Sequence, residues 1–200
     1  MPKKSAAQDS KILRFKVTLK GSKPPIWRRF EVPDTFTLGN LHYTLQIVMG
    51  WTNSHLHEFV MGSKHYGKPH PDDALFDFRL LDEDEVRLAE LGLKEKKKFL
   101  YSYDFGDGWE HDVLVEAILP PEEGAHYPRC ITGKRACPPE DCGGIWGYYN
   151  MLEILDDPKH EEYETYREWL GEDFRAGEFD VDAVNRALKG LGKRRKRAES

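Results

Sequence analysis

The sequence predicts an α+β fold, an antiparallel-rich sheet with a β-β-α-β start (β-grasp-like) and a C-terminal helical layer. Segments with an apolar residue at every second position occur at 12–20, 26–33 and 99–119, as in half-buried strands. After residue 143, apolar residues recur three and four positions apart, as in amphipathic helices. A run of strands followed by a run of helices is typical of the α+β class.

The first elements are predicted to be two strands and a helix. ILRFKVTLK (12–20) alternates apolar and polar residues, and IWRRFEVP (26–33) repeats the alternation until its closing proline. Thr37 is a suitable N-cap for a helix with apolar residues at spacings of three and four over 38–48, and Gly50 ends it. HLHEFVMG (55–62) then predicts a third strand, and HYGKPHPDD after it is typical of a loop.

The segment FLYSYDFGDGWEHDVLVEAIL (99–119) predicts a β-hairpin. Aromatic residues alternate along its first half and aliphatic residues along its second, and Asp107-Gly108 is a typical two-residue turn. With that turn, Asp104 lies opposite His111. We expect such a pair either to hold the hairpin together or to serve in acid–base chemistry.

Three helices are predicted after residue 143, around Tyr149, around Tyr166, and after a cap at Asp180. The chain therefore divides into a flexible arm (1–10), one domain (11–191) and a basic, disordered tail (192–200).

Composition limits the function classes. The 200 residues carry a formal net charge of -5, which argues against a chain built around phosphate binding. No apolar run approaches the roughly 18 residues of a membrane helix, and the polar N-terminus lacks a secretory signal. With three cysteines in that context, we expect reduced thiols and a cytoplasmic location, with no membrane partner.

The stretch PRCITGKRACPPEDCGGIWGYY contains all three cysteines: Cys130, Cys137 and Cys142. Three thiolates with His111 or His126 would make a four-ligand zinc site. However, no pair has C-x2-C spacing, so the preferred interpretation is a tight loop with structural thiols. No cofactor is therefore expected, with zinc as the alternative.

His55 and His57 lie two positions apart on the predicted third strand and would face the same side. Such a pair can chelate a metal, with His111 as a third ligand. Because Phe59 and Met61 share that face, hydrogen-bonded histidines in a packed surface are the favoured alternative.

The C-terminal tail contains five consecutive basic residues that would contact nucleic acid through its phosphates. They are Lys193, Arg194, Arg195, Lys196 and Arg197. A solvated, disordered terminus is the competing interpretation, and we favour it.

Five motifs together give the sequence a resemblance to a known family. WRRFEVP, MGW, HLHEF, YSYDFGDGWEH and CITGKRACPPEDCGGIWGYY occur in this order. The chain resembles the Ri-plasmid (pRiA4b) ORF-three-like proteins, some of which are labelled transposon-passenger or TnpR-like, over about residues 11 to 190. The resemblance implies a compact α+β domain of bacteria, archaea and mobile elements, and it supplies no catalytic residues.

The leading hypothesis for function is a binding or accessory module of mobile-element type, not an enzyme. Its surface is predicted from the hairpin and the PPEDCGG loop: Tyr103, Asp104, Asp107, Trp109, His111, Glu140, Asp141 and Trp146. The alternatives are a zinc protein or metal-dependent enzyme that uses the cysteine loop, and nucleic-acid binding through the tail.

Overall fold

The structure is a computed structural model that describes residues 10–69, 80–171 and 173–198, with side chains in the last helix described as far as residue 191. Within these residues, eight strands form one sheet in the order β5-β4-β3-β6-β7-β1-β2-β8. All neighbouring strands are antiparallel except β4 and β5. The strands are β1 (Ile12–Leu19), β2 (Trp27–Pro33), β3 (His57–Met61), β4 (Lys64–Gly67), β5 (Leu80–Asp82), β6 (Lys98–Tyr103), β7 (Trp109–Leu119) and β8 (Arg129–Lys134).

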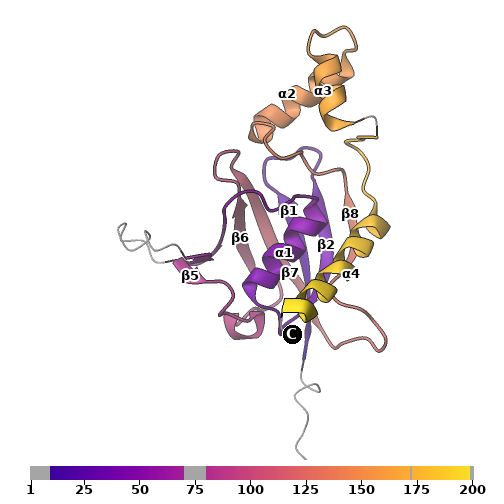
Figure 1. Cartoon of the computed structure of the whole chain (residues 1–200). Helices are drawn as coiled ribbons and strands as arrows, with labels where there is room; N and C mark the ends of the chain where they lie inside the picture. The colour runs from indigo at the N-terminus through magenta and orange to yellow at the C-terminus, as the bar shows by residue number, and fades with distance from the viewer. Residues whose placement is uncertain (1–9, 70–79, 172, 199–200) are drawn as a thin grey trace, which may run out of the picture.

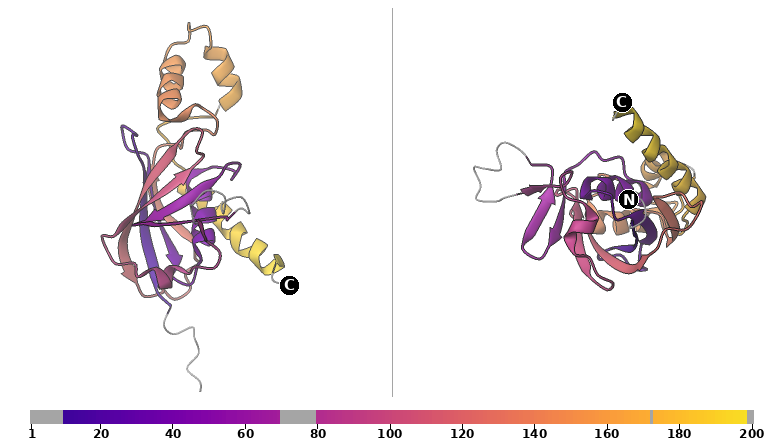
Figure 2. Two further views of the ribbon diagram at one scale, coloured as in Figure 1. Left: turned by 90° about the vertical axis from the view of Figure 1, so that its left-hand side faces the viewer. Right: turned by 90° about the horizontal axis from the view of Figure 1, so that it is seen from below.

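The helices are α1 (Leu38–Met49), the short 3-10 helix η2 (Leu88–Leu91), α2 (Gly144–Asp156), α3 (Tyr163–Leu170) and α4 (Val181–Ala198). The sheet curves around α1, and α4 packs against β8 and α1 (Figures 1 and 2). Helices α2 and α3 pair with each other and project beyond one end of the sheet. The α+β prediction is confirmed, although α4 rather than α2 or α3 forms the layer beside the sheet.

Local sequence explains the start of the chain. Phe15 and Val17 of β1 are fully buried, as the alternation predicts. The Thr37 hydroxyl accepts a hydrogen bond from the Asn40 N–H at 3.2 Å, and the Asn40 side chain accepts one from the Thr37 N–H, so both ends of a capping box are present. Gly50 ends α1 in the left-handed conformation (φ 102°). The β-β-α-β order is confirmed, but β6 and β7 separate β3 from β1.

The hairpin turn is longer than the sequence predicts. Tyr103 pairs with Trp109, and Tyr101, not Asp104, pairs with His111. Asp104 leaves the strand because its backbone is left-handed (φ 54°) and its carbonyl accepts the Gly108 N–H at 2.6 Å. The predicted Asp104–His111 pair is therefore wrong.

Two segments predicted as loops contain strands. His65–Gly67 belong to β4, and Cys130 belongs to β8, where it pairs with Phe30 of β2. Both strands are short: β4 is held between its sequence neighbours β3 and β5, and β8 pairs with the distant β2, a contact that local patterns do not reveal. The structure also differs from the prediction at the C-terminus, since α4 continues to Ala198 where a disordered tail from residue 192 was expected. Most of the predicted arm (1–9) lies outside the described residues.

Across the described ranges, none of the helices combines the length and the apolar character needed to cross a bilayer.

Candidate functional site

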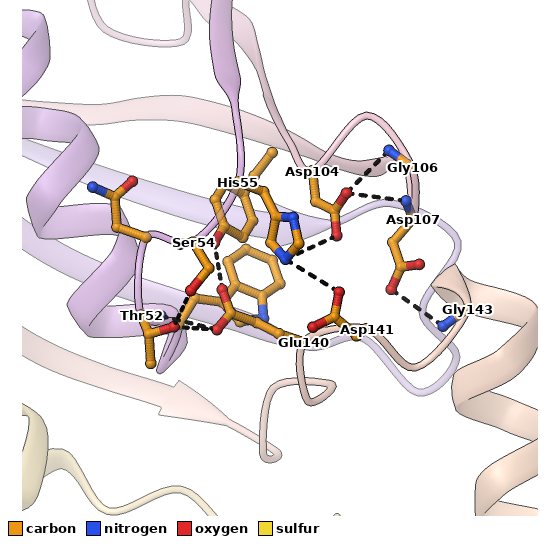
Figure 3. A network of polar contacts seen from close by, with 12 residues as sticks. Thr52, Ser54, His55, Asp104, Gly106, Asp107, Glu140, Asp141 and Gly143 are labelled. Carbon is orange, nitrogen blue, oxygen red and sulfur yellow. Dashed lines mark hydrogen bonds and ion pairs between the residues drawn. The ribbon is translucent and has the colours of Figure 1, made fainter.

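Three loops meet at the end of the sheet from which α2 projects. They are 50–56 between α1 and β3, the hairpin turn 104–108, and 135–143 between β8 and α2. Strand pairing brings the first two together, since His57 of β3 lies opposite Tyr103 of β6 and the Asp104 N–H donates to the Leu56 carbonyl at 2.9 Å. We call the polar cluster of His55, Asp104, Asp107, Glu140 and Asp141 the three-loop site (Figure 3).

The third loop is fastened to the hairpin turn. The Asp107 carboxylate accepts a hydrogen bond from the Gly143 N–H at 3.2 Å. Gly144 lies so close to the turn that a Cβ there would come within 2.4 Å of the Asp107 carbonyl oxygen. Glycine at this position is therefore required for the start of α2 to dock on the hairpin.

The centre of the site is a histidine between two aspartates. His55 Nε2 lies 3.6 Å from Asp104 Oδ2 and 3.2 Å from Asp141 Oδ1. Figure 3 shows the imidazole directed at both carboxylates. Asp104 is buried, whereas the Asp141 side chain is 73% exposed, so the cluster opens to solvent on the Asp141 side.

Asp104 is fixed by its own turn. Its Oδ1 atom accepts hydrogen bonds from the backbone N–H groups of Gly106 (3.0 Å) and Asp107 (3.3 Å). Its other oxygen, Oδ2, then faces His55. Because the Asp104 side chain caps its own turn in this way, the turn alone fixes its orientation.

Glu140 ties the first and third loops to the sheet. Its carboxylate accepts hydrogen bonds from the Thr52 N–H (3.3 Å), the Thr52 hydroxyl and the Tyr103 hydroxyl. Burial alone would raise the pKa of Glu140, but these hydrogen bonds outweigh it and lower the pKa. Burial, reinforced by the carboxylate, raises the pKa of the Tyr103 phenol, which therefore remains a donor.

Of the predicted surface, five residues lie at or beside this site. They are Tyr103, Asp104, Asp107, Glu140 and Asp141. Trp109 and His111 are 1% and 0% exposed, and both belong to the core face of β7 rather than to a surface. Trp146, near the start of α2, is 85% exposed.

The three thiols are not brought together with a fourth ligand. A group of three or more metal-ligating side chains occurs once among the described residues, and it is His55, Asp104 and Asp141 rather than the cysteines. Burial raises the pKa of Cys130 to about 11 and that of Cys142 to about 12, and it raises the pKa of Cys137 further. Such thiols behave as small apolar side chains, which fits the structural interpretation of this loop.

Neither predicted histidine partner completes a thiol site. His111 is buried in β7, where its Nδ1 lies 3.2 Å from the Tyr101 carbonyl, and His126 is exposed in the loop before β8. His55 and His57 do not face a common site, because His55 precedes β3 and contacts Asp104, while His57 contacts Glu83 at 2.7 Å; each imidazole thus meets a carboxylate, as the favoured interpretation predicts. The bend before β3 turns the two imidazoles toward different carboxylates.

A groove of about 950 Å³ adjoins His55. His57 and Glu83 line it, together with His42, whose imidazole stacks on that of His57. Burial, followed by repulsion from His57, lowers the pKa of His42 to about 3. The hydrophobic exposed residues Leu56 and Phe105 form part of the rim.

Sequence reasoning did not select His42 or Glu83, and it considered His55 only together with His57. Glu83 lies in the acidic stretch DEDE, which resembles an ordinary solvated segment, and it is nevertheless 0% exposed. The motif HLHEF was a usable signal for His55, but its partners become apparent only in three dimensions. The five basic residues 193–197 belong to α4, and their side chains lie outside the described part of the chain.

Fold and site together define a mixed α+β domain with a polar site assembled from three loops at one end of its sheet. The chain belongs to the plasmid pRiA4b ORF-3-like protein family, whose model matches residues 11–186. The resemblance inferred from the motifs is therefore confirmed.

Two relatives extend this assignment. The chain is 39% identical over 183 residues to "Uncharacterized protein y4hQ" of Sinorhizobium fredii (strain NBRC 101917 / NGR234), an alignment that covers 90% of this chain and 92% of that protein. It is also similar to the crystal structure of MM3350 from Methanosarcina mazei Go1, described as a protein of unknown function. That match has 43% identity and a TM-score of 0.79, and it covers 86% of this chain and 97% of the other.

Proposed function

We propose that this protein is an accessory binding module of mobile-element type, and that it binds a cationic ligand at the three-loop site. The observation that carries the proposal is the charge of the site. Its carboxylates are Asp104, Asp107, Glu140 and Asp141, and within the described residues no Lys or Arg side chain forms an ion pair with any of them. Apart from the His55 imidazole, the described residues provide no cationic partner for these four carboxylates, so the site favours a positively charged ligand.

The framework around these carboxylates supports binding rather than a random acidic surface. Glu140 and Asp104 are held by hydrogen bonds from the backbone and from Tyr103, so little ordering remains to be done when a ligand arrives. A cytoplasmic setting belongs to the same proposal, because the three cysteines are unpaired thiols that a reducing compartment preserves.

The test is an NMR titration of the 15N-labelled protein with cationic probes: spermidine, a tri-arginine peptide, ZnCl2 and MnCl2. We expect at least one probe to shift or broaden amides of 52–56, 104–108 and 139–143 selectively. The effect should be lost in the Asp104→Asn/Asp141→Asn double variant. Asparagine retains the turn geometry at these positive-φ positions (54° and 59°) and removes only the charge.

The matched control is Asp156→Asn, which removes an exposed carboxylate at the far end of α2. It should respond to the probes as the wild type does. If no probe affects the three loops, or if the double variant responds unchanged, the proposal is wrong.

A further inference from the structure

We propose that the cationic ligand is a divalent transition-metal ion, held by His55 Nε2, Asp104 Oδ2 and Asp141 Oδ1. This rests on the proposed function, since it names the ligand of the same site. The three ligand atoms come from three different loops, and all lie within 4.8 Å of one another. Asp141 lies in the cysteine loop, next to Cys142, but none of the three ligand atoms is a thiol sulfur.

The distances suit a common ion. Imidazole nitrogen and carboxylate oxygen bind such metals at about 2.0–2.2 Å, so two ligands on one ion lie roughly 3.0–3.5 Å apart. The observed separations from His55 Nε2 are 3.2 Å to Asp141 and 3.6 Å to Asp104. The third separation, between the Asp104 and Asp141 oxygens, is at most 4.8 Å, so binding of one ion by all three atoms requires a side-chain rotation, for which the exposed Asp141 has room.

A second observation points to a ligand at the same place. The Nε2 atom of His55 is shielded from solvent although its side chain is 27% exposed, and it contacts two carboxylates at ion-pair distance without an aligned hydrogen bond to either. Buried polar atoms are normally satisfied, so an atom of this kind next to two carboxylates needs an explanation. A metal ion bonded to the imidazole and to both carboxylates provides one.

The surroundings hold two of the three ligands in place. The second oxygen of Asp104 is occupied by the N–H groups of Gly106 and Asp107, which orients the free oxygen toward His55. The backbone around His55 is fixed by the Ser54 N–H, which donates to the Tyr103 hydroxyl at 3.0 Å. Asp141, 73% exposed, is the ligand that closes from the solvent side.

One imidazole with two carboxylates selects among metals. Mg²⁺ and Ca²⁺ prefer oxygen ligands alone, whereas Zn²⁺ and Mn²⁺ accept a mixture of imidazole and carboxylate. With three protein ligands, such an ion also has room for water or one donor group of a further ligand.

Calorimetry on the chelator-treated full chain tests the site with ZnCl2, MnCl2 and MgCl2. We expect one Zn²⁺ or Mn²⁺ per chain and much weaker Mg²⁺ binding. His55→Gln, Asp104→Asn and Asp141→Asn should each weaken binding at least about tenfold, while Asp156→Asn stays within about twofold. Thermal melts without metal keep folding defects apart from binding defects, and only variants that melt cooperatively are compared.

Absorption spectroscopy with Co²⁺, on the same set of proteins, tests whether the cysteines bind the metal. Binding through thiolates produces an intense sulfur-to-cobalt charge-transfer absorption, which the proposed site lacks. Metal binding that survives His55→Gln but is lost in Cys137→Ser, or less than about a tenth of an equivalent of bound metal, overturns the proposal. In that case, spermidine or tri-arginine serves as the deciding probe. If either one shifts the amides of the three loops in the wild type but not in the Asp104→Asn/Asp141→Asn variant, the binding module stands and only the metal is excluded.

Discussion

The imidazoles of His42 and His57 stack face to face, with ring centroids 3.4 Å apart and planes inclined by 6°. His57 Nε2 lies 2.7 Å from the buried Glu83 carboxylate, while the two ring nitrogens of His42 contact the Tyr101 hydroxyl and Asn53. Two stacked imidazoles repel each other when both are protonated. Burial, with this repulsion as the second cause, lowers the pKa of His42 and keeps it neutral at the wall of the groove.

Replacing His57 should raise the pKa of His42 from about 3. His57→Phe keeps most of the burial and removes the repulsion, so it should give the smaller rise. His57→Ala also admits water, and because burial is the larger cause, it should bring the pKa nearer to the ordinary value of about 6.5. NMR titration of the His42 ring protons measures both. Equal pKa values in the wild type and the two variants would contradict this account.

Acid should destabilise the fold through His42 and His111. Burial lowers their native pKa values to about 3 and about 4, below the roughly 6.5 of an unfolded chain. Below pH 6.5 the unfolded state therefore binds more protons, and the free energy of unfolding falls as pH drops. Between pH 7 and 5 each histidine should cost about 2 kcal/mol.

Urea denaturation at pH 7 and pH 5 measures this effect when the wild type is compared with His111→Gln. Its loss of stability between pH 7 and 5 should be smaller than that of the wild type by about 2 kcal/mol. If the variant does not fold, the ring-proton signals of His42 and His111 in the wild type decide instead. A titration of both near pH 6.5 would show that burial does not hold them neutral.

Glu140→Gln should loosen the three-loop site. The glutamine amide is a weaker acceptor than the carboxylate for the hydrogen bonds from Thr52 and Tyr103. We therefore expect the free energy of unfolding, measured by urea denaturation at pH 7, to fall by about 1–2 kcal/mol. Because the native pKa of Glu140 is lowered, its contribution is present above about pH 4.5 and is lost as pH falls through the native value. The difference between wild type and variant should therefore shrink below pH 4.5. The exposed Glu123→Gln serves as control, and an equal loss in it would argue against a specific role for Glu140.

Gly147→Ala should disturb the junction between the third loop and α2. An added Cβ would lie 1.9 Å from the Cys142 carbonyl oxygen, so backbone must shift, at a cost of about 1–3 kcal/mol. Gly190→Ala in α4 is the matched control, since nothing lies within 4 Å of its Cβ and the change should stabilise by about 0.5–1 kcal/mol. Chemical denaturation of both proteins measures the contrast, and equal stabilities would refute the close contact.

Local residue patterns are sufficient to predict several elements of this fold. Alternation in β1 and β2, the Thr37 cap with Gly50, and the helices after residue 143 follow from periods of two and 3.6 and from cap chemistry. The family was also accessible from the sequence, because its motifs are contiguous. Asp104, Glu140 and Asp141 were recognised as candidate residues for the same reason, since each belongs to a motif.

How those residues combine into a site depends on contacts between distant segments. Pairing of β3 with β6 placed Asp104 beside His55, and the left-handed backbone of Asp104 removed it from the strand that would have set it opposite His111. Cys130 belongs to β8 because that segment pairs with β2. Asp141 lies in the site because the start of α2 docks on the hairpin turn. Each of these contacts joins segments that lie far apart in the chain. Their free energy comes from pairing and burial between those segments, which no local pattern of residues encodes.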